Sequence, residues 1–303
     1  MSAIVSARSL ILSLVVGLCL HAPAVALERG GARTSDFQTV DSQTADFLAA
    51  DFRAGDYVDV ALVLAVDVSR SMSPDEIRIQ RRGYAEAITS PEVMRAIGQG
   101  APGRIALTLF EWAADFHVRE IVGWTIVATP ADAQAVADRL LQRSDAGATR
   151  TSISGAIAQG MRLLDALPYT AERRVIDVSG DGPNNQGLPV TQARDAAIAQ
   201  GITINGLPLM TEDGFASWFS IPDLDTYYRR CVIGGPGSFM IPVNGWDQFP
   251  EAVRRKLVLE IGTAPVPEPR VIPVQFQQPE PYDCLVGEKL WRQRGWQFQG
   301  PNP

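Results

Sequence analysis

The sequence predicts an α/β fold with a doubly wound, mostly parallel central sheet and helices on both faces. The first observation is that short β-compatible runs alternate with amphipathic helical segments from about residue 58 to residue 261. The second is the run Val58–Val66, which is apolar almost throughout. Such a run is typical of a strand that is buried on both faces of a parallel sheet.

The remaining elements follow in a regular order. After the first strand, Ser73-Pro74-Asp75-Glu76 supplies a capping serine, a proline at the first helical position and a glutamate three residues after the cap. This pattern predicts a helix that runs to about Ile97. Further strands are expected over 104–112, 116–127 (at the sheet edge), 174–178, 202–209 and 238–243. Further helices are expected over 131–143, 153–167, 189–200 and 246–261.

The segments on either side of this domain, taken as 58–262, have a different character. Residues 1–26 place Arg8 before a short apolar run and end in Ala24-Val25-Ala26, which predicts a cleaved signal peptide; an uncleaved anchor is the alternative. After cleavage we expect no stable membrane span, and a periplasmic or secreted protein. Residues 27–57 form a polar lead-in with one short helix near 45–52, and residues 263–303 form a proline-rich C-terminal tail.

Charge and cysteine content limit the function classes. The net charge of −7 argues against nucleic acid as a partner, because a phosphate backbone requires a dense basic surface. Removal of the signal peptide leaves Cys231 and Cys284 as the two cysteines. In an oxidising compartment we expect them to form a disulfide, and two free buried thiols are the alternative.

Three loops next to strand ends or helix starts carry oxygen-bearing side chains. They are Asp67-Val68-Ser69-Arg70-Ser71, the stretch 147–153 with its threonines, and Ser179-Gly180-Asp181-Gly182. In a doubly wound sheet, the loops at the carboxyl ends of the strands converge. Carboxylates and hydroxyls without histidine or thiol suit a hard divalent cation, with Mg²⁺ expected first and Mn²⁺ or Ca²⁺ as alternatives to it. Each loop alone is an ordinary turn or helix cap, and only their combination indicates a site.

The order and spacing of these loops resemble the metal-ion-dependent adhesion site of von Willebrand factor type A domains. The resemblance extends over Val58 to Ile261, and the stretch Asp177–Asn185 is also similar to that of an uncharacterised family of secreted bacterial proteins with this domain. The resemblance implies that five residues form the metal site: Asp67, Ser69, Ser71, Thr151 and Asp181. Thr149 is the alternative to Thr151, which we prefer for its register with the following helix. Arg150, between them, departs from the family pattern.

The resemblance favours a binding module over an enzyme. The metal ion would recruit an acidic side chain or a C-terminal carboxylate of a protein partner. A metal-dependent hydrolase or phosphatase is the first alternative, but Ser69 stands where phosphatases of the dehalogenase type carry their second aspartate. The sequence also has no Gly-x-Ser-x-Gly elbow and no Walker lysine loop. A structural envelope protein, in which the metal ion only makes the loops rigid, is the third class.

Overall fold

The computed structural model describes residues 57–142, 149–211, 220–262 and 281–298. The expected signal peptide, the lead-in as far as residue 56 and most of the C-terminal tail lie outside these residues, as does the short helix expected near 45–52. None of the described helices is long and apolar enough to cross a membrane.

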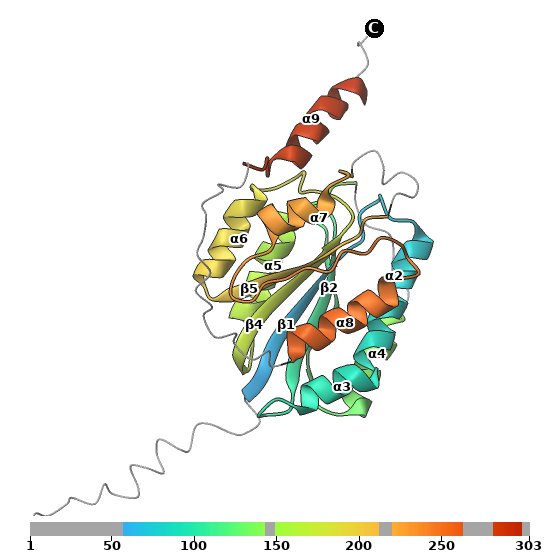
Figure 1. Cartoon of the computed structure of the whole chain (residues 1–303), viewed down its shortest axis with the longest axis vertical. Helices are drawn as coiled ribbons and strands as arrows, with labels where there is room; N and C mark the ends of the chain where they lie inside the picture. Colours follow the sequence, from blue (N-terminus) through green and yellow to red (C-terminus); the bar gives the residue numbers. More distant parts are fainter. Residues whose placement is uncertain (1–56, 143–148, 212–219, 263–280, 299–303) are drawn as a thin grey trace, which may run out of the picture. The chain divides into compact units, whose positions relative to one another are not determined.

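The centre of the domain is a five-stranded sheet with the strand order β3-β2-β1-β4-β5. Figure 1 labels β2, β1, β4 and β5 of this sheet. Strand β1 pairs in parallel with β2 on one side and β4 on the other, and β4 pairs in parallel with β5. Only β3 is antiparallel, at the edge next to β2. The predicted mostly parallel sheet is therefore confirmed. The strands are β1 (Tyr57–Asp67), β2 (Ile105–Trp112), β3 (Val118–Val127), β4 (Thr170–Gly180) and β5 (Ile202–Pro208).

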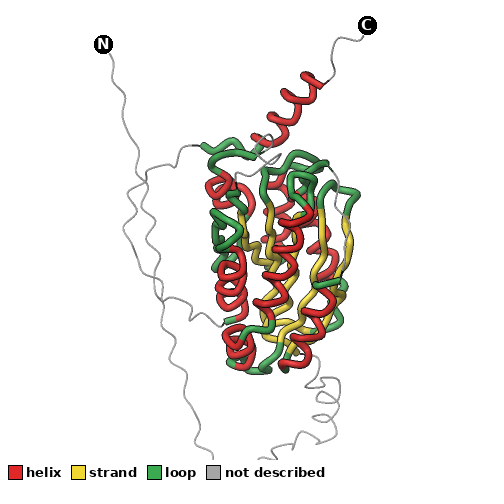
Figure 2. Tube along the Cα trace, turned by 90° about the vertical axis from the view of Figure 1, so that its right-hand side faces the viewer, coloured by secondary structure: helices red, strands yellow, loops and turns green. Residues whose placement is uncertain are grey.

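Helices cover both faces of the sheet, as the doubly wound prediction requires (Figure 2). Alternate residues of β1 point to opposite faces, so Leu62 and Leu64 belong to one hydrophobic core and Ala61 and Val63 to the other. The first core packs against α2 (Pro74–Ile88), α3 (Pro91–Gly98), α4 (Pro130–Leu140) and α8 (Phe249–Ile261). The second packs against α5 (Ile153–Asp165), α6 (Val190–Ala199), α7 (Leu224–Tyr227) and η3 (Tyr228–Val232).

Two expected elements differ from the structure. The single helix expected over 73–97 is two helices, because Ser90 begins α3 as a cap that accepts a hydrogen bond from the Val93 N–H at 3.3 Å, and Pro91 has no N–H to continue α2. The strand expected over 238–243 is absent from the described sheet. Only isolated bridges form there, at Met240 and Val243, and Pro242 between them has no N–H for a ladder.

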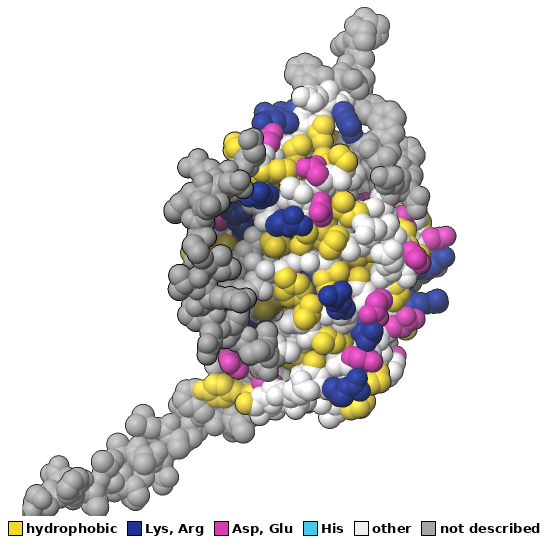
Figure 3. All heavy atoms as spheres, in the orientation of Figure 1, with side chains coloured by type: hydrophobic (Ala, Val, Ile, Leu, Met, Phe, Trp, Pro, Cys, Tyr) yellow, Lys and Arg dark blue, Asp and Glu magenta, His cyan; other side chains and the backbone are white. Residues whose placement is uncertain are grey.

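Two further helical segments had no clear sequence signal. The α7–η3 segment follows β5, and α9 (Val286–Phe298) lies within the tail. Val286 and Leu290 of α9 pack against the second core. On the face drawn in Figure 3, basic and acidic side chains are interspersed, so neither sign of charge dominates that face.

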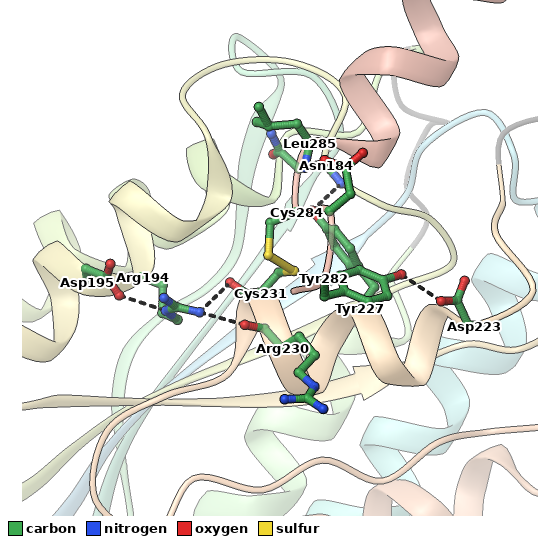
Figure 4. Close-up of a disulfide and its surroundings, with 11 residues drawn as sticks. Asn184, Arg194, Asp195, Asp223, Tyr227, Arg230, Cys231, Tyr282, Cys284 and Leu285 are labelled. Carbon is green, nitrogen blue, oxygen red and sulfur yellow. Dashed lines mark hydrogen bonds and ion pairs between the residues drawn. A yellow bond between two sulfur atoms is a disulfide. The ribbon is translucent and has the colours of Figure 1, made fainter. Parts of the chain in front are cut away.

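A disulfide fastens the start of α9 to η3. Cys231 and Cys284 form the bond, which confirms the predicted pair (Figure 4). Beside it, the hydroxyl of Tyr282 donates a hydrogen bond to Oδ2 of Asp223 at 2.9 Å. Tyr227 packs against Tyr282, with 6.3 Å between the ring centroids. The residues that lead into α9 are thus attached to the α7–η3 segment by covalent, polar and aromatic contacts.

A charged cluster is buried between α8 and the sheet. The ammonium group of Lys256 lies 2.8 Å from Oδ1 of Asp177 and also contacts Oε1 of Glu260, and all three side chains are almost fully buried. The amide of Asn205 donates a second hydrogen bond to Glu260 at 2.9 Å. Burial, reinforced by the charge of Asp177, raises the pKa of Glu260 to about 7.

Candidate metal site

The first site loop starts at the centre of the sheet. Asp67 is the last residue of β1, and the neighbouring strand β4 ends at Gly180, one position beyond the Val66–Ser179 pair. The chain leaves β1 for β2 on one side, while β4 lies on the other. In open α/β sheets, ligands bind in the crevice at such a switch point, beyond the carboxyl ends of the strands.

A chain of hydrogen bonds connects four of the five predicted residues. The backbone N–H of Ser69 donates to Oδ1 of Asp67 at 2.7 Å, and the hydroxyls of Ser69 and Ser71 lie 2.8 Å apart. The Ser71 hydroxyl donates in turn to Oδ1 of Asp181 at 2.9 Å. The loops after β1 and β4 therefore place their hydroxyl and carboxylate oxygens side by side.

Thr151 is brought to the same edge through its backbone. Its N–H donates to Oδ1 of Asn185 at 3.0 Å, and the Asn185 N–H donates to the carbonyl oxygen of Thr151 at 2.9 Å. The next residue, Ser152, donates its N–H to the carbonyl oxygen of Ala113 at 2.8 Å, just beyond the end of β2. The loop of Thr151 is thus fastened to the loop that carries Asp181 and to the strand beside Asp67.

The two threonines of this loop differ in burial. Thr151 is 6% exposed, whereas Thr149 is exposed to solvent. The helix-capping role belongs to neither of them, because the hydroxyl of Ser152 accepts a hydrogen bond from the Gly155 N–H at 3.2 Å. The hydroxyl of Thr151 is therefore not required to cap α5.

The two carboxylates are buried next to each other. Burial raises the pKa of Asp67 well above its usual range, and the charge of Asp181 raises it further. Burial also raises the pKa of Asp181 to about 6, and the charge of Glu76 adds to this effect. Two buried carboxylates without a cation are unfavourable in their charged form. A divalent cation would offset both charges.

Two buried polar atoms at the site have no hydrogen-bond partner among the described residues. They are Oδ2 of Asp67 and the hydroxyl of Tyr228 in η3. Both lie at Gly180, because a Cβ atom placed on this glycine would be 2.9 Å from Oδ2 and 3.0 Å from the hydroxyl. The absence of a side chain at Gly180 thus leaves space for the Asp67 carboxylate. Oδ2 of this carboxylate remains available to bind a cation.

The donor set fits a hard cation. It consists of carboxylate and hydroxyl oxygens, which are the ligands that Mg²⁺, Mn²⁺ and Ca²⁺ prefer. Within the described parts of the chain, no group of three or more histidine, cysteine, aspartate or glutamate side chains could hold a metal ion. The candidate site differs from such a group, because it combines only two carboxylates with serine and threonine hydroxyls.

Three side chains that shape the site were not predicted from the sequence. Tyr228 reaches Asp67 from a segment with no sequence signal, and Asn184 and Asn185 hold the Thr151 loop. Asn184 accepts a hydrogen bond from the Ser154 N–H at 3.0 Å. The pair of asparagines directly after Gly-Asp-Gly-Pro is the signal from which a polar clamp could have been predicted, since buried amides require partners.

The chain matches one protein family over the region that forms this fold and this site. A family model described as "Protein of unknown function (DUF1194)" matches residues 57–265, which is more than half of the chain. The chain belongs to the DUF1194 family. The match covers all five strands that the structure describes in this DUF1194 protein, and it ends before Cys284 and α9.

Solved structures show the same fold. Proximal thread matrix protein 1 from the mussel byssus is 13% identical with a TM-score of 0.50, and the match covers 67% of this chain and 48% of that one. The pilus adhesin SpaC from Lactobacillus rhamnosus GG is 13% identical with a TM-score of 0.51, covering 67% and 31%. The DUF1194 chain thus spans less than half of either protein. At this identity the likeness establishes a von Willebrand factor A-like fold. No curated protein matches the sequence significantly.

Proposed function

We propose that this DUF1194 protein is an exported, metal-dependent protein-binding module. One divalent cation, Mg²⁺ in the first place, is held by Asp67, Ser69, Ser71, Thr151 and Asp181 and recruits a carboxylate of a protein partner. The observation that carries the proposal is the hydrogen-bonded chain from Asp67 to Asp181, together with the unpartnered oxygen of Asp67.

The protein's own residues would prepare the site. Gln80 donates its amide N–H to the backbone oxygen of Asp67 at 3.1 Å and holds the end of β1 in place. Asn185 holds the backbone of Thr151 from both sides. When bound, the cation supplies a positive centre with an open coordination position, and a partner's carboxylate oxygen is the ligand that this position attracts.

Other features support export and binding over catalysis. A disulfide is a feature of oxidising compartments and agrees with the predicted signal peptide. The structural neighbours are a matrix protein and an adhesin. Ser69 is hydrogen-bonded to Ser71 at the position where a phosphatase of the dehalogenase type would need a second aspartate. We therefore propose a binding role without turnover.

The test is capture of a partner after cross-linking in an envelope extract, with Mg²⁺ or with a chelator. Asp67→Ala should abolish capture, and chelator should do the same to the wild type. Asp75→Ala is the matched control, because Asp75 is an exposed carboxylate on α2 paired with Arg78. Capture that chelator leaves unchanged would overturn the proposal. A metal-dependent rise in melting temperature without any partner would instead favour the purely structural role.

A further inference from the structure

A pocket lies beside the Thr151 loop, between the segment 185–189 and α9. Its volume is about 440 Å³, within the range of roughly 300–1,000 Å³ that is typical of ligand pockets. Pro189 and Leu285 supply apolar walls, and Trp291 adds an aromatic one. The charged side chains in its lining are Arg150, Glu288 and Arg292.

The α9 wall of this pocket is held in place at several points. The disulfide attaches Cys284, and the amide of Asn184 donates a hydrogen bond to Oε1 of Glu288 at 2.8 Å. The backbone at Gly287 approaches so closely that an added Cβ would be 2.1 Å from the carbonyl oxygen of Asn184. This wall lies beyond residue 265, where the family match ends.

The pocket and the proposed metal site share a wall. Arg150 directly precedes Thr151, and its guanidinium group lies 3.7 Å from the centroid of the Trp291 ring. Asn185 lines the pocket and also holds the backbone of Thr151. A ligand in the pocket would therefore lie next to a group bound at the proposed metal site.

Exposed apolar residues line the pocket or lie close to it. Phe116 is 77% exposed, Leu188 62% and Leu285 38%. Leu188 lies between the pocket residues Gly187 and Pro189, and the residue before Phe116 donates its backbone N–H to the side chain of the pocket residue Gln186. Exposed apolar side chains grouped around a pocket are typical of interaction surfaces.

The charges select an acidic partner. Two arginines and one glutamate line the pocket, which gives it a positive balance on a chain whose net charge is −7. Glu288 is already engaged by Asn184. The guanidinium of Arg150 stacks on Trp291 and donates to the carbonyl oxygen of Asn185. The charge of Asp115 also acts on it, but no ion pair joins the two, and Arg150 directly precedes the proposed metal ligand Thr151. Both features attract negative charge to the same place.

The geometry points to this pocket as the second half of the partner-binding surface. We propose that it takes a large apolar side chain of a protein segment whose neighbouring acidic residue binds the metal ion. This inference rests on the proposed function and adds the class of segment that is recognised, an acidic residue close to a bulky apolar one.

The test uses a displayed library of random short peptides, selected on the full chain with Mg²⁺ and eluted with a chelator. We expect the eluted peptides to share an aspartate or glutamate at a fixed, short spacing from a large apolar residue. A labelled copy of an enriched peptide should bind Leu285→Ala and Arg150→Ala about tenfold more weakly than the wild type, which corresponds to about 1.4 kcal/mol. Leu188→Ala serves as a second variant if either protein fails to fold.

The matched control is Leu259→Ala on α8. Leu259 is 48% exposed. The next residue, Glu260, accepts a hydrogen bond from Arg173 at its carbonyl oxygen. Arg173 lies near the start of β4, so Leu259 is at the opposite end of the strands from the pocket. This variant should bind the peptide as the wild type does. Peptides with an acidic residue but no apolar preference, or equal binding by the pocket variants, overturn the pocket proposal while metal-dependent binding stands. Failure of the wild type to bind Mg²⁺ in calorimetry overturns both proposals.

Discussion

The hydroxyl of Ser71 donates a hydrogen bond to Oδ1 of Asp181 over 2.9 Å, although the two residues are 110 positions apart in the sequence. The Ser69 and Ser71 hydroxyls are 2.8 Å apart. Neighbouring ligands of an octahedral Mg²⁺ ion at about 2.1 Å are also about 3 Å apart. The Ser71 hydroxyl thus lies at the spacing of neighbouring ligands in one coordination shell from both the Ser69 hydroxyl and the Asp181 carboxylate.

Removal of the Ser71 hydroxyl should therefore affect metal binding as well as stability. Ser71→Ala removes a hydrogen bond to a buried carboxylate, and we expect about 1–3 kcal/mol lower stability without metal. Mg²⁺ should then no longer raise the melting temperature. The control is Thr129→Ala, which removes the exposed hydroxyl that caps α4 and should cost about 1 kcal/mol. If Mg²⁺ raises the melting temperature of Ser71→Ala as much as that of the wild type, Ser71 is not a metal ligand.

The choice between Thr149 and Thr151 is tested by a pair of variants. Because Thr151 is buried and held by Asn185, Thr151→Ala should abolish the thermal response to Mg²⁺. Thr151→Ser keeps the hydroxyl and should restore the response. Thr149→Ala, at an exposed position, should behave as the wild type does. The reverse pattern would assign the ligand role to Thr149.

The cluster around Glu260 predicts a specific pH dependence. Lys256 on the same helix, Asp177 on β4, Asn205 on β5 and Tyr84 on α2 surround its carboxyl group. The folded pKa of about 7 exceeds the ordinary value of 4.5, so the folded protein holds this proton more tightly than the unfolded chain. The resulting stability is complete below about pH 4.5 and is lost as the pH rises through about 7.

Glu260→Gln removes this titration. Between about pH 5 and 7, the unfolding free energy of the wild type should therefore fall relative to that of the variant, by up to about 1.4 kcal/mol per pH unit for one proton. Urea denaturation of both proteins at several pH values measures the difference. Parallel curves over this range would show that the carboxyl group does not titrate as the cluster implies.

The sequence predicted the regular parts of this fold because local patterns determine them. The apolar run of β1, the capping box of α2 and the loop Asp67–Ser71 all follow from neighbouring residues. Ser90-Pro91 was a local signal as well, and it explains why the expected long helix is two helices. The pairing of β1 with β4 then brings Asp67 close to Asp181. This agrees with the expectation that the loops at the carboxyl ends of the strands converge.

The remaining parts depend on contacts between distant segments. Tyr228 reaches the site because η3 packs on the second core, and no spacing in the sequence indicates this. The position of α9 depends on the disulfide and on a close backbone contact with Asn184. A proline-rich stretch before it gave no sign that a helix would return to the domain.

The docking of α9 is tested at Gly287. A Cβ there would collide with the carbonyl oxygen of Asn184, so Gly287→Ala should release the helix from the 183–185 loop despite the higher helix propensity of alanine. Hydrogen exchange in α9 should become faster. Gly98→Ala in α3 is the control, because a Cβ at that position has nothing within 4 Å. Unchanged protection of α9 in Gly287→Ala would contradict the described contact.

The most direct test of the central claim is a calorimetric titration of Mg²⁺ into the wild type, Asp67→Asn and Asp75→Asn. Asp67→Asn keeps the shape of the side chain but replaces the buried, ionisable carboxyl group with a neutral amide. Oδ2 of this carboxyl group has no partner among the described residues. We predict one binding event in the wild type and in Asp75→Asn, and a loss of affinity of about 100-fold or more in Asp67→Asn. Absence of binding in the wild type for Mg²⁺, Mn²⁺ and Ca²⁺, or undiminished affinity in Asp67→Asn, would contradict the account.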